Sequence, residues 1–144
     1  MKNKKIKSEI NPHEILRSHD LKVTPQRLLV YSILVNSKHH LSVDEVYSEV
    51  LRTLPSVSRA TVYATLECFK THNLVKDIRI DPTRSFFETR TDWHHHFLCK
   101  KCGKVFDVEV KPCMPMKSCV VDEHIIEDFQ GYFYGVCKKC KKKK

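Results

Sequence analysis

Residues 86–107 read FFETRTDWHHHFLCKKCGKVFD. This segment contains three consecutive histidines, His94 to His96, followed by the pair Cys99-x-x-Cys102, and it also contains the carboxylates Glu88 and Asp107. Imidazole, thiolate and carboxylate groups are the side chains that bind metal ions in proteins. The segment therefore predicts two kinds of metal chemistry close together in the chain.

A second Cys-x-x-Cys pair, Cys137 and Cys140, stands near the C-terminus. Each pair places two thiolates on one tight turn, and two such pairs bind one tetrahedral zinc ion, normally in a closed structural site. We therefore predict a structural Zn(II) site of Cys99, Cys102, Cys137 and Cys140. The alternatives are two redox dithiols or thiols without metal, but the sequence lacks the βαβ pattern of a thioredoxin-like domain.

The histidines predict a second metal site. On a strand His94 and His96 share one face and His95 points away, because side chains alternate. Glu88 and Asp107 could add oxygen ligands, and His40, from a loop in the first half, could complete the set. Such a mixed site suits Fe(II) or Mn(II), or with fewer ligands Zn(II). Because its ligands come from both halves, metal binding would act as a switch. The alternative is solvated histidines beside ordinary salt bridges.

Composition narrows the class of protein. The 144 residues contain 26 Lys and Arg against 17 Asp and Glu, a net charge of +9. This excess suits a partner that carries phosphates, although a solvated basic surface would look the same. The chain has seven cysteines and no apolar N-terminal segment of signal or membrane length. We expect a cytoplasmic, reduced protein with no membrane partner.

The first half has the element order of a winged helix-turn-helix. Helices are expected at 12–20, 24–37, 42–51 and 58–70, followed by strands at 74–80 and 85–89. Helix starts are marked by Thr24 before Pro25, and by Ser42 with Glu45 three residues later. We predict a DNA-binding domain at 1–89 whose recognition helix is 58–70. A helical protein-interaction module is the alternative.

Double-stranded DNA is the predicted partner of this half. In the recognition helix Val62, Leu66 and Phe69 form an apolar stripe, which leaves the other face for phosphates and base edges. Two arginines of the strand hairpin would lie on the wing beside the duplex, and the helix start at 24–27 carries a further arginine. The predicted DNA-binding residues are Arg27, Arg59, Thr61, Tyr63, Thr65, Arg79 and Arg84.

Residues 90–144 predict a small α/β module around the zinc site. Strands are expected at 104–110, 125–126 and 132–134, with a short helix at 116–123. A sheet this short has open edges that a second copy would cover, so we expect a homodimer. The predicted fold class is α+β, a winged helix-turn-helix followed by a small dimerisation domain. Cys68 is expected in the core, and Cys113 and Cys119 have no assigned role.

From about Pro12 to Cys140 the chain resembles the ferric uptake regulator (Fur) family of metal-dependent repressors. The motifs are TPQR at 24–27, ATVY at 60–63, His94 to His96 ahead of CKKCGK at 99–104, and YGVCKKC at 134–140. The resemblance implies a homodimer, a structural Zn(Cys)4 site, and regulatory ligands at His40, Glu88, His94, His96 and Asp107.

Within the family the peroxide-sensing PerR branch is most similar, because Asp107 follows the Cys-Gly-Lys strand. In that branch Fe(II) is held by three histidines and two carboxylates, and peroxide oxidises a ligand histidine and releases DNA. The position that matches the oxidised histidine is His40, and His94 is the second candidate. Glu88, however, matches the Fur proteins. A repressor that senses peroxide is therefore our first reading, and an iron- or zinc-responsive uptake regulator is the alternative.

Two readings from other classes remain. A metallohydrolase could use His94, His96 and a carboxylate around a catalytic zinc. So small a domain offers little room for a substrate cleft and a general base, so we expect no enzyme. A zinc-stabilised adapter is the other reading. DNA binding that requires metal would separate a regulator from both.

Overall fold

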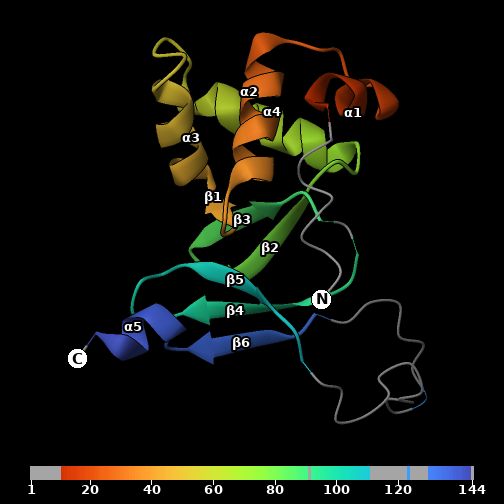
Figure 1. Cartoon of the computed structure of the whole chain (residues 1–144). Coiled ribbons are helices and arrows are strands. Elements are labelled where there is room, and N and C mark those ends of the chain that lie inside the picture. The colour runs from red at the N-terminus through yellow and green to blue at the C-terminus, as the bar shows by residue number, and fades with distance from the viewer. Residues whose placement is uncertain (1–10, 91, 111–122, 124–129, 144) are drawn as a thin grey trace. The chain divides into compact units, whose positions relative to one another are not determined.

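The structure is a computed structural model that describes residues 11–90, 92–110, 123 and 130–143 (Figure 1). The chain divides into two compact units, Met1–Asp92 and Trp93–Lys144, hereafter unit 1 and unit 2. Each unit contains one three-stranded sheet. The functional domain boundary expected after residue 89 stays a prediction.

Unit 1 begins with four helices, each of which starts at a capped residue. They are α1 (Pro12–Ser18), α2 (Pro25–Asn36), α3 (Val43–Leu51) and α4 (Arg59–Thr71). The hydroxyls of Thr24 and Ser58 accept hydrogen bonds from backbone N–H groups at the starts of α2 and α4. Ser42 and Glu45 form both bonds of a capping box before α3. These bonds satisfy donors that a helix leaves unpaired, so the sequence signals and the helix starts agree.

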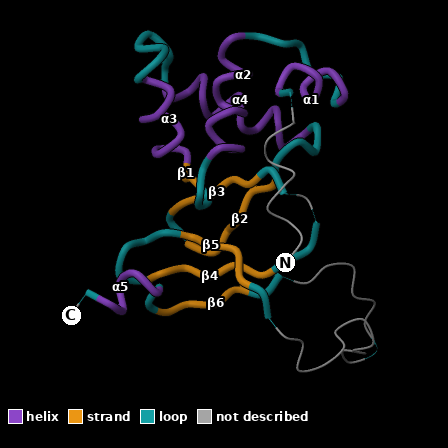
Figure 2. The backbone as a smooth tube through the Cα atoms, in the orientation of Figure 1, coloured by secondary structure: helices purple, strands orange, loops and turns teal. Residues whose placement is uncertain are grey.

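The sheet of unit 1 combines a hairpin with a short extra strand (Figure 2). Strands β2 (Lys76–Asp81) and β3 (Arg84–Glu88) pair antiparallel, and β1 (Leu41–Ser42) pairs with the other edge of β3. The sequence predicts only the loop that carries His40 between the helices expected at 24–37 and 42–51, so strand β1 was missed. A strand of two residues carries no periodic signal of its own and exists because β3 offers it a partner.

Apolar side chains of the helices form the core of unit 1. The ring of Phe69 on α4 meets Tyr31 on α2 edge to face at a centroid distance of 6.2 Å. Cys68 is partly buried and packs against this core. The fully buried residues of the cluster, which fix α4 against the other helices, are Leu16, Val30, Val46, Val50, Val62, Leu66 and Phe69.

Unit 2 holds a mixed sheet and one short helix. Its strands are β4 (His95–Cys99), β5 (Val105–Val108) and β6 (Tyr132–Gly135), with β4 in the centre, antiparallel to β5 and parallel to β6. Helix α5 (Lys138–Lys142) follows, which the sequence analysis did not predict. The expected strand at 125–126 and, except for Glu123, the expected helix at 116–123 lie outside the described residues, as do Cys113 and Cys119.

No helix in the part of the chain that the structure describes is long and apolar enough to cross a membrane.

Candidate functional site

The two Cys-x-x-Cys turns of unit 2 lie side by side. Cys99 ends β4 and is fully buried. Gly103 then takes a φ of 70°, which only glycine adopts freely, and its N–H donates to the carbonyl of Cys99 at 2.8 Å. From the second turn, the N–H of Cys137 donates to the Cys99 sulfur at 3.3 Å. The backbone thus holds all four cysteines in one place.

The sulfur positions fit a tetrahedral zinc ion. One sulfur from each of Cys99, Cys102, Cys137 and Cys140 lies within 4.8 Å of the others. The Cys102 and Cys137 sulfurs are 3.9 Å apart. Zn–S bonds of about 2.3 Å in a tetrahedron place two sulfurs roughly 3.8 Å apart. The four-cysteine set therefore suits structural zinc.

The electrostatics of the four thiols also favour a cation. Backbone N–H groups, first that of Cys137, stabilise the Cys99 thiolate and lower its pKa to about 6. Hydrogen bonding to Cys137, together with burial, raises the pKa of Cys140 to about 12. One thiolate therefore forms readily, whereas the thiol of Cys140 resists ionisation beside its neighbours. A divalent ion supplies the charge that lets all four ionise.

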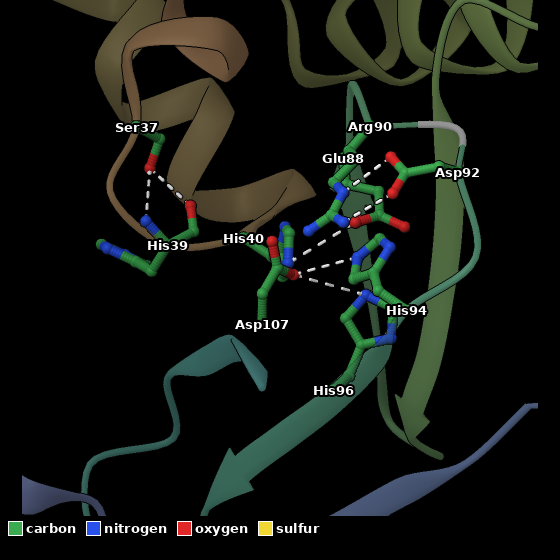
Figure 3. A network of polar contacts seen from close by, with 9 residues as sticks. All are labelled: Ser37, His39, His40, Glu88, Arg90, Asp92, His94, His96 and Asp107. Carbon is green, nitrogen blue, oxygen red and sulfur yellow. Dashed lines mark hydrogen bonds and ion pairs between the residues drawn. The ribbon is translucent and has the colours of Figure 1, made fainter. Parts of the chain in front are cut away.

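The sheet register of unit 2 builds a histidine–carboxylate group. His96 on β4 lies directly opposite Asp107 on β5. His94, two residues before His96, projects on the same side, and its Nε2 is 3.0 Å from Asp107 Oδ1 (Figure 3). The corresponding distance from His96 Nε2 is 3.7 Å. Three possible ligands therefore converge on one point, whereas the ring of His95 contacts Trp93 and Phe133 instead.

The sheet register of unit 1 builds a second, smaller group. Leu41 pairs with Phe87, so the antiparallel ladder brings His40 beside Glu88. His40 Nε2 is 3.6 Å from Glu88 Oε2 (Figure 3), and Glu88 is buried with 5% of its surface exposed. A buried carboxylate is costly unless it is paired, so this position is built for a cationic partner. Imidazole nitrogens combined with carboxylate oxygens suit Fe or Mn.

Helix α4 exposes the N-terminal part of the face expected to meet DNA. Arg59, Thr61 and Tyr63 are exposed, and so is Ala64. Thr65 is not, because it is buried with 9% of its surface exposed and its hydroxyl donates to the Thr61 carbonyl at 2.9 Å. The expectation that Thr65 lies on the exposed face is wrong.

The helical periodicity of α4 explains why Thr65 was wrongly expected on the exposed face and why Ala64 was missed. Thr65 lies three residues after Val62 and four before Phe69, so it belongs to the buried stripe despite its polar side chain. Ala64 occupies the exposed position instead. Its four-residue spacing from the exposed Ala60 could have identified it, but its small apolar side chain gave no chemical signal.

The expected DNA-binding arginines all have partners in unit 1. Arg59 Nε is 2.7 Å from Asp44 Oδ1, and the exposed Arg79 and Arg84 pair with Asp77 and Asp81. These aspartates were not singled out from the sequence, although Asp77 and Arg79 share one face of β2.

Arg27 differs from the other arginines because it bridges two parts of unit 1. Its guanidinium donates to the Lys22 carbonyl at 2.8 Å and to the Cys68 sulfur at 3.5 Å. These bonds tie the Arg27 side chain within unit 1 at the start of α2, and its contact with DNA stays a prediction.

A family model described as the ferric uptake regulator family matches residues 18–129. The chain belongs to this family. The peroxide-responsive repressor PerR of Staphylococcus epidermidis is 32% identical over 128 residues, which are 88% of this chain and 85% of that protein.

Solved structures of the family share the fold. The Campylobacter jejuni peroxide stress regulator is 30% identical, with a TM-score of 0.60 over 91% of this chain and all of the other. The Helicobacter pylori ferric uptake regulator Fur, whose structure reveals three functional metal-binding sites, has a TM-score of 0.74 at 21% identity, over 92% and 95% of the two chains. The predicted α+β fold, a winged helix-turn-helix followed by a small α/β domain, is confirmed, as is the resemblance to Fur and PerR regulators.

Proposed function

We propose that this Fur-family protein is a metal-dependent DNA-binding repressor in which His40, Glu88, His94, His96 and Asp107 bind one Fe(II) or Mn(II) ion. The observation that carries the proposal is that each sheet register already assembles its own donors. His96 faces Asp107 in unit 2, and Leu41 pairs with Phe87 in unit 1 next to His40 and Glu88. Neither group alone supplies the ligands of a full coordination shell.

Chain connectivity supports a shared ion. Only residues 89–93 separate Glu88 from His94. Six residue steps span at most about 20 Å even when extended, so the two donor groups cannot move far apart. An ion that takes ligands from both groups would restrict the units to one arrangement. It would stabilise that arrangement by its differential affinity, which is the requirement for a switch.

Helix α4 and the β2–β3 hairpin supply the proposed DNA surface. The first turn of α4 has no acidic residue, and a helix N-terminus favours phosphate. Arg59, Thr61 and Tyr63 project from this part of the helix, and the hairpin adds Arg79 and Arg84. We propose that Arg27 and Thr65 support this surface from within unit 1, because the side chain of each donates a hydrogen bond to a backbone carbonyl there.

A homodimer would present two such surfaces to an operator with two half-sites. Unit 2 is the proposed dimerisation domain. Among the described strands β6 lies at one edge of its sheet and exposes Phe133 and Tyr134, and an apolar sheet edge favours pairing with a second copy. We place the protein in the cytoplasm, where cysteines remain reduced and available to zinc.

We further propose that the protein senses peroxide. Its similarity to the peroxide-responsive repressors and the presence of Asp107 support this reading. A bound Fe(II) would supply the redox chemistry by which peroxide oxidises a neighbouring imidazole. His40 and His94 are the proposed targets. Oxidation of either ring would remove a nitrogen ligand, loosen the ion and release DNA.

Anaerobic DNA binding tests this function. The zinc-containing protein would be loaded with Fe(II) or with Mn(II), and its affinity for a duplex selected from a random library would be measured before and after a small excess of peroxide. We expect both metals to support binding, and we expect peroxide to abolish it only in the Fe(II) sample. Mass spectrometry should then find oxygen added to His40 or His94.

Two other outcomes would change the assignment. Metal-dependent binding that ignores peroxide would make the protein a metal-supply regulator, the function that Glu88 favours. DNA binding that is equal with and without either metal would contradict both the peroxide-sensor assignment and the metal-supply assignment.

A further inference from the structure

The two zinc-binding turns of unit 2 carry eight exposed lysines. Lys100, Lys101 and Lys104 belong to the first turn, and the remaining five lie within 138–143, on and beside α5. We refer to these eight residues as the lysine surface. The two turns are in contact, since Lys100 N–H donates to the Gly135 carbonyl at 2.8 Å and the Lys101 ammonium group lies 3.4 Å from the Lys143 carbonyl.

Within the described part of the chain, the lysine surface differs from the arginines of unit 1 because its lysines have no ion-pair partners. Arg59, Arg79 and Arg84 each pair with an aspartate. Among the described residues, by contrast, none of the eight lysines forms an ion pair. A Zn(Cys)4 centre carries a net charge of −2, so it offsets only a small part of this positive charge. Eight lysine charges gathered on two adjoining turns create a local field that attracts anions.

Zinc would hold the surface in shape. Helix α5 has only five residues. The ligand Cys137 directly precedes its first residue, and the ligand Cys140 lies within it. So short and lysine-rich a helix is not stable by itself in water, because its like charges repel and its nucleation is costly. The Cys137 carbonyl accepts the N–H of Lys141 at 2.9 Å, which continues the turn into the helix. The lysines are therefore presented on a fixed scaffold.

We infer that the lysine surface is a second, sequence-independent DNA-binding surface that contacts phosphates outside the bases read by α4. This inference rests on the proposed DNA-binding function. Lysine neutralises phosphates as a point charge without reading bases. Once α4 has bound, the same duplex is present at high effective concentration, so individually weak contacts add to affinity. Duplex DNA is favoured over a membrane because α5 is too short and too uniformly charged to form the apolar face of a membrane-surface helix, its one residue other than lysine being the ligand Cys140.

The test removes charge without removing zinc ligands. In one variant Lys138, Lys139, Lys141 and Lys142 become glutamine, and in the matched control the same four become arginine. Both proteins would be loaded with zinc and Mn(II), and their metal content and dimer state compared with the original. Affinity would be measured over a range of salt concentrations for a selected operator and for a scrambled duplex of equal length.

We expect the glutamine variant to lose roughly tenfold or more in affinity for both duplexes, with the ratio between them unchanged. The salt dependence should become less steep by about one unit for each lost phosphate contact. The arginine variant should behave like the original. Unchanged affinity and salt dependence in the glutamine variant would overturn the inference, as would a loss seen only with RNA or with anionic lipid vesicles.

The same data separate this inference from the proposed function. If the original protein bound operator and scrambled DNA equally, and the glutamine variant still lost affinity for both, the repressor function would fail while the lysine surface stood. If operator preference were intact and the glutamine variant bound normally, the lysine inference alone would fail.

Discussion

Asp107 Oδ1 lies 3.0 Å from His94 Nε2 and 3.7 Å from His96 Nε2, while the neighbouring Glu109 is exposed on the same segment. Asp107, although 38% of its side chain is exposed, meets two imidazoles on one face of the sheet and is placed as a ligand, whereas Glu109 pairs with no imidazole among the described residues. The pair Asp107 and Glu109 therefore provides a matched comparison of the same chemistry in two positions.

We expect Asp107→Ala to weaken Mn(II) binding by at least about tenfold, the scale on which even outer partners of metal ligands act. Glu109→Ala removes the same charge from the same strand end and should change Mn(II) affinity less than about twofold, since within the described chain Glu109 meets neither His94 nor His96 and an exposed charge at a distance contributes little. Electron paramagnetic resonance of Mn(II) titrations measures both affinities. Equal losses in the two variants would show that only net charge matters and would remove Asp107 from the site.

Cys137 supplies both a sulfur and the N–H that stabilises the Cys99 thiolate. We expect Cys137→Ser to lose zinc and to unfold unit 2, because structural zinc contributes on the order of 10 kcal/mol to the folding of such modules. Cys68→Ser, outside the four-cysteine set, should keep one zinc per chain. Elemental analysis and limited proteolysis would report both properties. Full zinc content in Cys137→Ser would disprove the four-cysteine assignment.

At the scale of elements, α4 separates a buried stripe from an exposed surface that we propose faces DNA, and Thr65 and Tyr63 lie on opposite sides of that division. We expect Tyr63→Ala to lower operator affinity by about 1–3 kcal/mol if the ring contacts bases or phosphates. Thr65→Val should leave DNA affinity nearly unchanged and cost about 1 kcal/mol of folding stability through its lost hydrogen bond. Fluorescence anisotropy and thermal unfolding distinguish these effects. A large loss of DNA affinity in Thr65→Val alone would reverse the assignment of the two faces.

Asp77 joins α4 to the wing, since Lys70 Nζ and Arg79 Nε lie 3.1 and 3.0 Å from its Oδ2. Burial opposes its ionisation, but the hydrogen bonds from Lys70 and Arg79 outweigh burial and lower the pKa of Asp77. A lowered folded pKa stabilises the fold above the unfolded value of about 3.9. That stability is lost as the pH falls through the folded value.

We therefore expect Asp77→Asn to lower stability by about 0.5–1 kcal/mol at neutral pH, the scale of a partly exposed ion pair. The difference from the original protein should shrink as the pH falls below about 4, where the carboxylate takes up its proton. Glu49→Gln, which breaks an exposed pair with Arg52, serves as the comparison and should cost less. Urea unfolding at several pH values measures the free energy of unfolding of each variant and of the original protein. A difference that stayed constant into acid would indicate lost packing instead of lost charge.

The elements also show what sequence reasoning can and cannot supply. The starts of α2 and α3 were predictable because Thr24 and Ser42 are caps whose hydrogen bonds are local. Strand β1 and helix α5 were not, because one depends on pairing with β3 and the other on cysteines that are distant in sequence. The alternation of His94, His95 and His96 was predictable from strand geometry, whereas the register that sets His96 opposite Asp107 required the fold.

At the scale of the whole molecule, the central claim is that one Fe(II) or Mn(II) ion joins donors of unit 1 to donors of unit 2. In this proposal the ion adds a link between the units besides the chain segment at 89–93, and this link fixes the spacing of the two proposed DNA-facing surfaces of a dimer. With the ion, their spacing would match an operator. A few kcal/mol of differential metal affinity is sufficient to shift such an equilibrium.

The most direct test is the operator affinity of the zinc-loaded dimer measured as a function of free Mn(II), with Asp107→Ala measured in parallel. We expect affinity to rise steeply and then saturate as Mn(II) binds, with the curve of Asp107→Ala displaced to higher Mn(II) by at least about tenfold. Tight operator binding that is the same at every Mn(II) concentration, in both proteins, would contradict the claim that this metal site controls DNA binding.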